Sequence, residues 1–151
     1  MRVGETPDFL QSIANHPRVY PHVSFAGCGV IDLSGIWPDC IALEFETGGW
    51  LFHRQEPDTY EVHTLFLPKS EGVREKSQQA LRHMFEVAGA RLILTQIATD
   101  LPHVRRLALA GGFEKFASKQ AAYCKDSGPV DVDYYELTQE AWANKEQGKC
   151  Q

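Results

Sequence analysis

Hydrophobic and polar positions alternate along CIALEFETGGWLFHR, residues 40–54. Ile41, Leu43 and Phe45 are apolar and alternate with Ala42, Glu44 and Glu46. A period of two is typical of a strand that is buried on one face. Residues 47–49 supply turn chemistry before a second apolar run at 50–54. The segment therefore predicts a β-hairpin.

Two further strands are predicted downstream. TYEVHTLFLP alternates at first and is apolar on both faces at its end, which indicates a strand that runs from exposed to deeply buried and ends at Pro68. RLILTQIA, Arg91 to Ala98, is a second largely buried strand. Shorter strands are predicted in FEKFAS and around Val132 to Leu137.

Helical periodicity separates these strands. From Val73 the period changes to about 3.6, with an apolar stripe that ends at Gly89. The stripe consists of Val73, Ala80, Leu81, Met84, Phe85 and Ala88. A second helix begins near Pro102 and ends at Gly111 and Gly112, and a short helix near the N-terminus stops at Pro17.

The order of these elements predicts an α/β (α+β) fold, with a sheet that carries helices on its faces. No repeat or linker divides the chain, so we expect a single domain over 1–151. Residues 1–40 form its N-terminal helix and loop region, and 139–151 form a polar tail that frays.

Composition narrows the function classes. The chain has 151 residues and a net charge of −5, which argues against a protein whose task is to neutralise a nucleic-acid backbone. It has no run of about 18 apolar residues and no secretory signal, so we expect a cytoplasmic protein without a membrane span. The four cysteines, Cys28, Cys40, Cys124 and Cys150, are far apart and predict reduced thiols, and no metal motif is present.

The junction KSEGVREKSQ lies between a strand and a helix. The N-terminus of a helix presents unpaired N–H groups that bind anions. Gly72 lets the backbone approach a ligand, and Lys69, Arg74 and Lys76 add positive charge. The junction lacks both GxxxxGK[ST] and GxGxxG. A plain turn is therefore the alternative to a phosphate site.

Residues 41–142 resemble the GCN5-related N-acetyltransferase (GNAT) superfamily. The resemblance is carried by VHTLFLPKSEGVREKSQQALRHMF and RLILTQIATDLPHVRRLALAGGF. It implies a GNAT-like central mixed sheet flanked by helices, and an acyl-CoA-dependent N-acyltransferase that uses acetyl-CoA. The acceptor is then a small-molecule or protein amine.

The resemblance also implies a cofactor site. Its expected residues are Leu65, Phe66, Leu67, Lys69, Ser70, Glu71, Gly72, Val73, Arg74 and Asp100. In the family this loop reads Gln or Arg, two residues, Gly, one residue, then Gly or Ala. Gly72 matches, Lys69 keeps the charge, and Arg74 replaces a small residue. Asp100 stands where the family often has asparagine.

For the chemistry, the family uses a general base on the strands beside the centre of the sheet and a tyrosine that protonates the departing thiolate. Glu44, Glu46, Glu61 and His63 are base candidates, and we favour His63 and Glu61 because their strand leads into the loop. The alternative places the three glutamates on the solvent face of their strands. Leu107 and Ala108 stand near the tyrosine position, so the usual acid is missing. Tyr123, Tyr134 and Tyr135 replace it only if the fold brings one to the cleft.

A second hypothesis keeps the fold without the catalysis. NHPRVYPH and DLPHVRRLALAGG are weakly similar to GNAT-like proteins of short-tailed bacteriophage morphogenesis regions. That similarity implies an assembly or interaction factor that binds a protein partner. Such a factor would be a phage head protein or an internal virion protein. Its location would then be the virion.

Overall fold

One mixed sheet of seven strands runs through the molecule. The computed structural model describes residues 1–149, and the strand order is β1-β2-β3-β4-β5-β7-β6. The strands are β1 (Arg2–Val3), β2 (Cys40–Phe45), β3 (Gly48–Glu56), β4 (Thr59–Phe66), β5 (Leu92–Ala98), β6 (Glu114–Lys125) and β7 (Gly128–Thr138). Only β4 and β5 are parallel among the strand pairs of the described residues.

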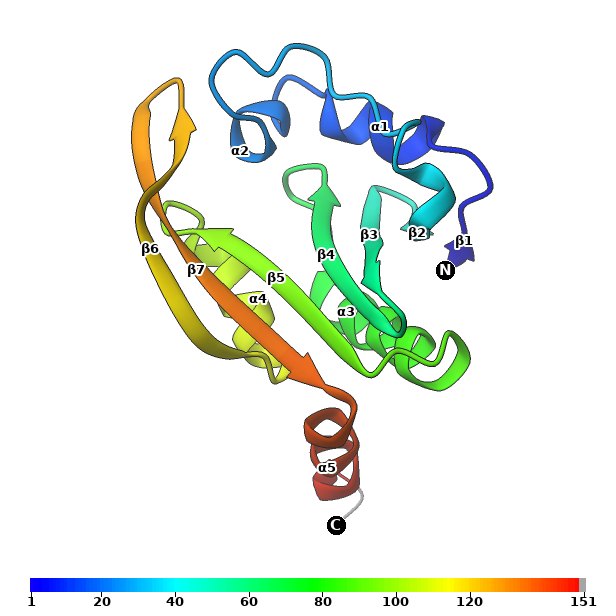
Figure 1. Cartoon of the computed structure of the whole chain (residues 1–151). Coiled ribbons are helices and arrows are strands. Elements are labelled where there is room, and N and C mark those ends of the chain that lie inside the picture. The colour runs from blue at the N-terminus through cyan, green and yellow to red at the C-terminus, as the bar shows by residue number, and fades with distance from the viewer. Residues whose placement is uncertain (150–151) are drawn as a thin grey trace.

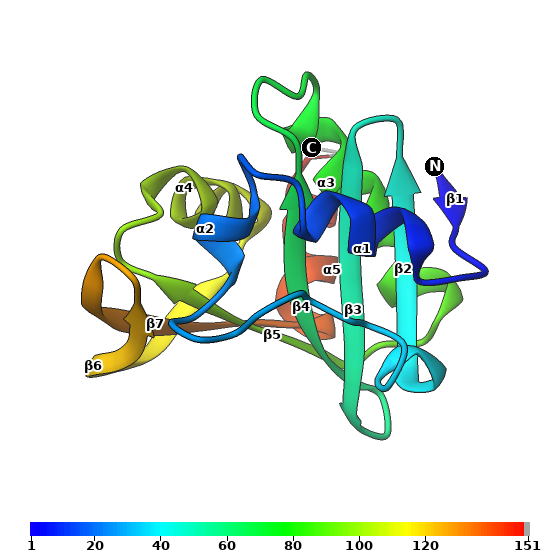
Figure 2. The same cartoon turned by 90° about the horizontal axis from the view of Figure 1, so that it is seen from above.

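Helices lie on both faces of this sheet (Figures 1 and 2). They are α1 (Asp8–Ala14), α2 (Tyr20–Val23), α3 (Val73–Arg82), α4 (Pro102–Gly111) and α5 (Gln139–Lys149), with a short 3-10 turn η1 (Trp37–Asp39) and a π-helical turn η2 (His83–Val87). Helices α3 and α4 pack on one face over the larger apolar core, and α1 packs on the other face over the smaller core. Figure 2 shows α1 crossing β3 and β4.

The strands β4 and β5 separate in the middle of the sheet. They pair over only three positions, Thr59–Leu92, Tyr60–Ile93 and Glu61–Leu94. Beyond these positions β4 stays paired with β3, and β5 stays paired with β7, so the two halves of the sheet diverge (Figure 1). The divergence leaves backbone groups of both strands without a neighbouring strand.

Most predicted elements are confirmed. The N-terminal helix, the hairpin of β2 and β3, the strands β4 and β5 and the helices α3 and α4 all form where the sequence pattern predicts them. The predicted α/β class, with a central mixed sheet flanked by helices, is the observed architecture. Gly72, Gly89 and Gly112 lie at helix ends, and each has a positive φ that suits glycine.

The C-terminal third differs from the prediction. The strands β6 and β7 are longer than expected, with 12 and 11 residues. The segment after residue 138 begins as the helix α5, whereas the sequence predicts a polar tail that frays. Trp142 anchors α5, because its ring is 8% exposed and stacks on Phe85 with centroids 5.2 Å apart. Residues 150–151, which include Cys150, lie outside the described part of the chain.

Candidate active site

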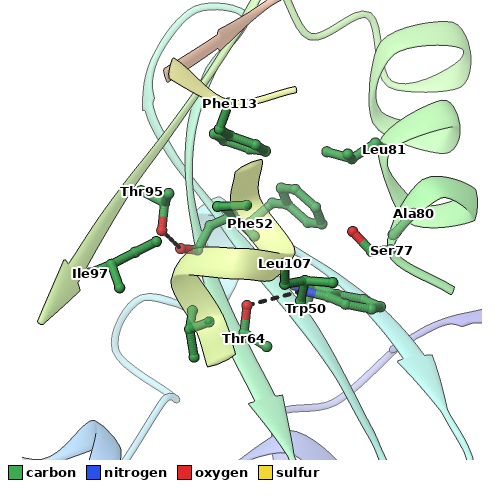
Figure 3. A pocket seen from close by; sticks show the side chains of 13 residues that line it. Trp50, Phe52, Thr64, Ser77, Ala80, Leu81, Thr95, Ile97, Leu107 and Phe113 are labelled. Carbon is green, nitrogen blue, oxygen red and sulfur yellow. Dashed lines mark hydrogen bonds between the residues drawn. The ribbon is translucent and has the colours of Figure 1, made fainter. Parts of the chain in front are cut away.

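A cavity lies where β4 and β5 separate, between the sheet and the helices α3 and α4 (Figure 3). Its volume is about 30 Å³, which holds a water molecule but not an acyl-CoA arm. Most of its walls are apolar. The lining residues are Trp50, Phe52, Val62, Thr64, Ser77, Ala80, Leu81, Thr95, Ile97, Val104, Leu107, Ala108 and Phe113.

Hydroxyl groups supply polarity in this cavity. Thr95 is 9% exposed, and its Oγ1 donates a hydrogen bond of 3.2 Å to the carbonyl oxygen of Val62, across the gap between the two strands. Trp50 Nε1 donates a hydrogen bond of 3.0 Å to Thr64 Oγ1 (Figure 3). The Thr95 bond crosses the gap next to the last paired position of β4 and β5.

The loop between β4 and α3 has the backbone of an anion site. Gly72 precedes the first residue of α3 in the left-handed region, with φ 64°, and a Cβ at this position would meet only Glu75 Oε2 and Lys76 Cε, both in ordinary contact at 3.9 Å. Lys69 also has a positive φ of 63°. The first N–H groups of α3 follow Gly72 directly, and such groups have no partner within their helix. The local geometry suits a phosphate group.

Hydrogen bonds connect side chains of the loop to its backbone and to Thr47. Thr47 Oγ1 bonds Ser70 Oγ at 2.8 Å, and Ser70 Oγ donates to the carbonyl oxygen of Leu67 at 2.6 Å. Lys76 Nζ donates to the carbonyl oxygen of Glu71 at 2.8 Å. These bonds fix the shape of the loop.

Charges of both signs surround the loop. Lys69 and Arg74 are exposed, and Val73 is half-buried as the first residue of α3. Glu71 and Glu75 are also exposed, and they oppose an anion. Binding at this loop therefore depends mainly on backbone N–H groups.

The strand β4 presents only alternate residues to the gap. Since the Val62 carbonyl points toward β5, strand geometry places the backbone groups of Val62, Thr64 and Phe66 on the gap side. Leu65 lies opposite Gly49 in the ladder with β3. The backbone N–H of Leu67 donates to the carbonyl oxygen of Thr47 at 2.9 Å. Of the predicted trio 65–67, Phe66 has its backbone on the gap side.

The structure brings the two predicted catalytic residues together. His63 Nε2 lies 3.2 Å from Glu61 Oε1, and Gln96 Nε2 donates to Glu61 Oε2 at 3.3 Å. The hydrogen bond from His63 lowers the pKa of Glu61 against the effect of burial, with smaller lowering contributions from Gln96 and from the charge of His53. An ionised Glu61 orients the imidazole by accepting its Nε2–H, which leaves Nδ1 as the basic atom.

This pair sits at the opening of the gap. Glu61 belongs to the last paired position of β4 and β5, and His63 lies two residues beyond it on the face opposite Tyr60, Val62 and Thr64. The His63 side chain is 47% exposed. It is therefore accessible to a ligand from solvent.

Two other positions that the resemblance names do not carry the expected chemistry. Asp100 is held in an ion pair, and the position of the expected tyrosine is apolar. Both carboxylate oxygens of Asp100 accept hydrogen bonds from Lys125 Nζ, at 3.0 and 3.1 Å, and Lys125 is 7% exposed. Leu107 of α4 lines the cavity near the position of the expected tyrosine, and Ala108 lines it as well.

None of the three tyrosines considered for the acid role lines the cavity. Tyr123 donates to the carbonyl oxygen of Val23, and Tyr135 is buried with 1% exposure. Tyr134 is paired with Gln96 in the β5–β7 ladder, so it lies on the His63 side of the sheet.

The expectation that Glu44 lies on the solvent face of its strand is wrong. Glu44 is 3% exposed, and its Oε1 accepts a hydrogen bond of 2.9 Å from Arg2 Nε of β1. The strand β1 pairs with β2 here and places Arg2 opposite Glu44. A strand of two residues is too short to give an alternating sequence pattern, so the sequence does not predict it. Glu46 is exposed.

No group of three or more His, Cys, Asp or Glu side chains is placed to hold a metal ion within residues 1–149. No helix in that range is long and apolar enough to cross a membrane.

Comparison with known proteins identifies the fold. No protein-family model matches the sequence, and no curated protein matches it either. Spermidine N-acetyltransferase from Vibrio cholerae in complex with CoA and spermine superposes with a TM-score of 0.75 at 16% identity, over 95% of this chain and 96% of that chain. A variant of the same enzyme, SpeG, gives a TM-score of 0.62 at 16% identity, over 71% and 69%.

A third similar structure is an acetyltransferase of the GNAT family from Bacillus anthracis. It has a TM-score of 0.56 at 19% identity and covers 62% of this chain, which spans 59% of that protein's length. Likeness at this identity establishes a shared fold. The chain thus has the fold of GNAT acetyltransferases.

Proposed function

We propose that this protein is an acyl-CoA-dependent N-acyltransferase that transfers an acyl group to an amine. The observation that carries the proposal is the separation of β4 from β5 beyond Glu61 and Leu94, next to a helix N-terminus that opens at Gly72. The free backbone edges of the gap suit the amide groups of a pantetheine arm, and the N–H groups at Gly72 suit its pyrophosphate.

The His63–Glu61 pair supplies a base on the open side of the gap. Its geometry suits removal of a proton from an amine that attacks a thioester held between the strands. CoA would be held by Lys69, Arg74 and the amides that follow Gly72, and it would supply the activated acyl group. The neighbour from Vibrio cholerae binds CoA and spermine, which supports an amine as the class of acceptor.

The test is acyl transfer from acetyl-CoA to a panel of amines that includes spermidine, spermine and a lysine peptide, measured as release of free thiol. We expect amine-dependent release, and we expect His63→Ala to reduce it by at least about 100-fold, as is typical for loss of a general base. His83→Ala is the matched control, because His83 lies in η2 and away from the gap. Equal rates in wild type and His63→Ala would remove His63 from the mechanism.

A non-catalytic assembly or interaction factor with the same fold is the second candidate. Two observations favour it. The cavity at the gap is only about 30 Å³, and Thr95 already occupies the Val62 carbonyl that a cofactor arm would need. In that case no amine of the panel stimulates thiol release.

A further inference from the structure

Thr64 has a hydrogen-bond donor that the fold does not use. A hydroxyl has one proton to donate and two lone pairs, whereas the Trp indole N–H can only donate. In the bond of 3.0 Å between Trp50 and Thr64, Thr64 Oγ1 is therefore the acceptor. Among the interactions described for residues 1–149, Thr64 Oγ1 donates to no acceptor.

The tryptophan fixes the position of this hydroxyl. Trp50 is 4% exposed and is held by edge contacts with Phe45 and Phe66, with ring centroids 5.7 and 4.6 Å away. Its N–H occupies one lone pair of Thr64, so the hydroxyl proton points elsewhere. Thr95, the other threonine of the cavity, donates its proton to Val62.

Thr64 stands in the part of β4 that has no partner in β5. It lies three residues beyond Glu61, the last paired residue, and its side chain lines the same cavity as Leu107 (Figure 3). His63, the adjacent residue, projects from the opposite face of β4. A thioester held in the gap would thus have a base on one side and an unused hydroxyl donor on the other.

We propose that Thr64 is a catalytic hydrogen-bond donor to the sulfur of the departing CoA, and that Trp50 is its positioning residue. The proposal rests on the proposed acyltransferase function. Thr64 would stabilise the departing thiolate, which is the role that the resemblance assigns to a tyrosine near position 107. This chain has Leu107 there.

The amine nitrogen attacks the thioester carbonyl carbon, a C–N bond forms and the C–S bond breaks. The amine loses one proton to His63. The sulfur leaves as a thiolate that accepts the Thr64 hydrogen bond and later takes a proton from water. Thr64 keeps its proton throughout, so its part is electrostatic.

Thr64→Val tests this role, because it keeps the shape of the side chain and removes the hydroxyl. We expect kcat to fall by about 100-fold, at the lower end of the range for loss of one donor to a developing charge, with little change in the Kd for CoA. Thr64→Ser should recover most of the rate. Thr59→Val is the matched control at the start of the same strand, outside the gap.

A spectroscopic measurement separates this role from a structural one. Titration of the ultraviolet thiolate absorbance of bound CoA should show a higher thiol pKa in Thr64→Val than in wild type, and Trp50→Phe should show a smaller increase. If Thr64→Val titrates and turns over as wild type does, the Thr64 proposal is wrong and the acyltransferase proposal stands. If wild type binds no CoA, both proposals are wrong.

Since loss of the hydroxyl leaves the Trp50 N–H without its acceptor, the folding of Thr64→Val must be checked. The double variant Trp50→Phe with Thr64→Val removes both partners. We expect it to fold and to retain the slow turnover of Thr64→Val. Recovery of the wild-type rate in the double variant would overturn the proposal.

Discussion

His63 Nε2 lies 3.2 Å from Glu61 Oε1, at the point where β4 leaves β5. Two positions apart on one strand, the side chains share a face, and Gln96 of β5 holds the other carboxylate oxygen. The pair is therefore fixed by both strands that border the gap. This arrangement makes His63 the strongest candidate for the base.

The first prediction concerns the pH dependence of stability. The His63 hydrogen bond lowers the pKa of Glu61 in the folded protein below its ordinary value of 4.5. A lowered carboxyl pKa contributes stability that is fully present above the ordinary value and is lost as the pH falls through the folded-state value. We therefore expect wild type to be more stable than Glu61→Gln at neutral pH, and this difference to shrink as the pH falls below 4.5.

Thermal unfolding of the two proteins across this pH range measures the effect. Glu46→Gln is the control, because Glu46 is exposed and has no ion pair described within residues 1–149. A stability difference that stays constant as the pH falls would contradict the assignment of an ionised, hydrogen-bonded Glu61.

The second prediction concerns the attachment of α5. Trp142 is 8% exposed and stacks on Phe85 with an angle of 23° between the ring planes. Trp142→Ala should lower the free energy of unfolding by about 3 kcal/mol, because it removes a large buried ring. Trp37→Ala, at a half-buried ring in η1, should cost less. A change under about 0.5 kcal/mol in Trp142→Ala would show that α5 is not docked.

The third prediction concerns thiol reactivity. Burial, aided by the charge of Asp39, raises the pKa of Cys40 from 9.0 to about 11. The thiolate is the reactive form, so a shift of this size reduces its population about 100-fold near neutral pH. In native protein Cys40 should therefore be alkylated more slowly than the exposed Cys124.

Peptide mapping after timed alkylation assigns each rate to its cysteine. In denaturant the two rates should become similar, because the cause is burial in the fold. Equally fast labelling of Cys40 in the native protein would contradict its protected position.

Periodic patterns explain why the centre of the fold was predictable. The strands β2 to β5 and the helices α3 and α4 each bury one face or both, so their hydrophobic residues recur at the strand or helix period. The long strand β6 is exposed along almost its whole length and carries no such signal beyond residue 118. Helix α5 has one large buried anchor, Trp142, which is too little for a periodic stripe.

The site was predictable only in part. The proximity of His63 and Glu61 follows from alternation along one strand. The sequence does not show how many residues of β4 pair with β5, because the pairing joins segments about 30 residues apart and depends on the whole sheet. Bonds such as Trp50 to Thr64 and Arg2 to Glu44 depend on strand register, and no local pattern reports register between β1 and β2.

The proposed acyltransferase function requires that the loop at Gly72 binds the pyrophosphate of CoA. Isothermal titration of acetyl-CoA and CoA into wild type, Gly72→Asp and Gly89→Asp measures this. Both glycines have a positive φ near 70°, so the two variants introduce the same charge and a similar backbone strain. A Cβ at Gly72 meets Glu75 Oε2 and Lys76 Cε in ordinary contact at 3.9 Å, and a Cβ at Gly89 meets nothing within 4 Å. Only Gly72 adjoins the N-terminus of α3.

We predict saturable binding of both ligands to wild type and to Gly89→Asp, with binding lost in Gly72→Asp because a carboxylate stands among the phosphate contacts. Absence of binding heat in wild type at high ligand concentration would contradict the account and leave the fold as a scaffold for a protein partner.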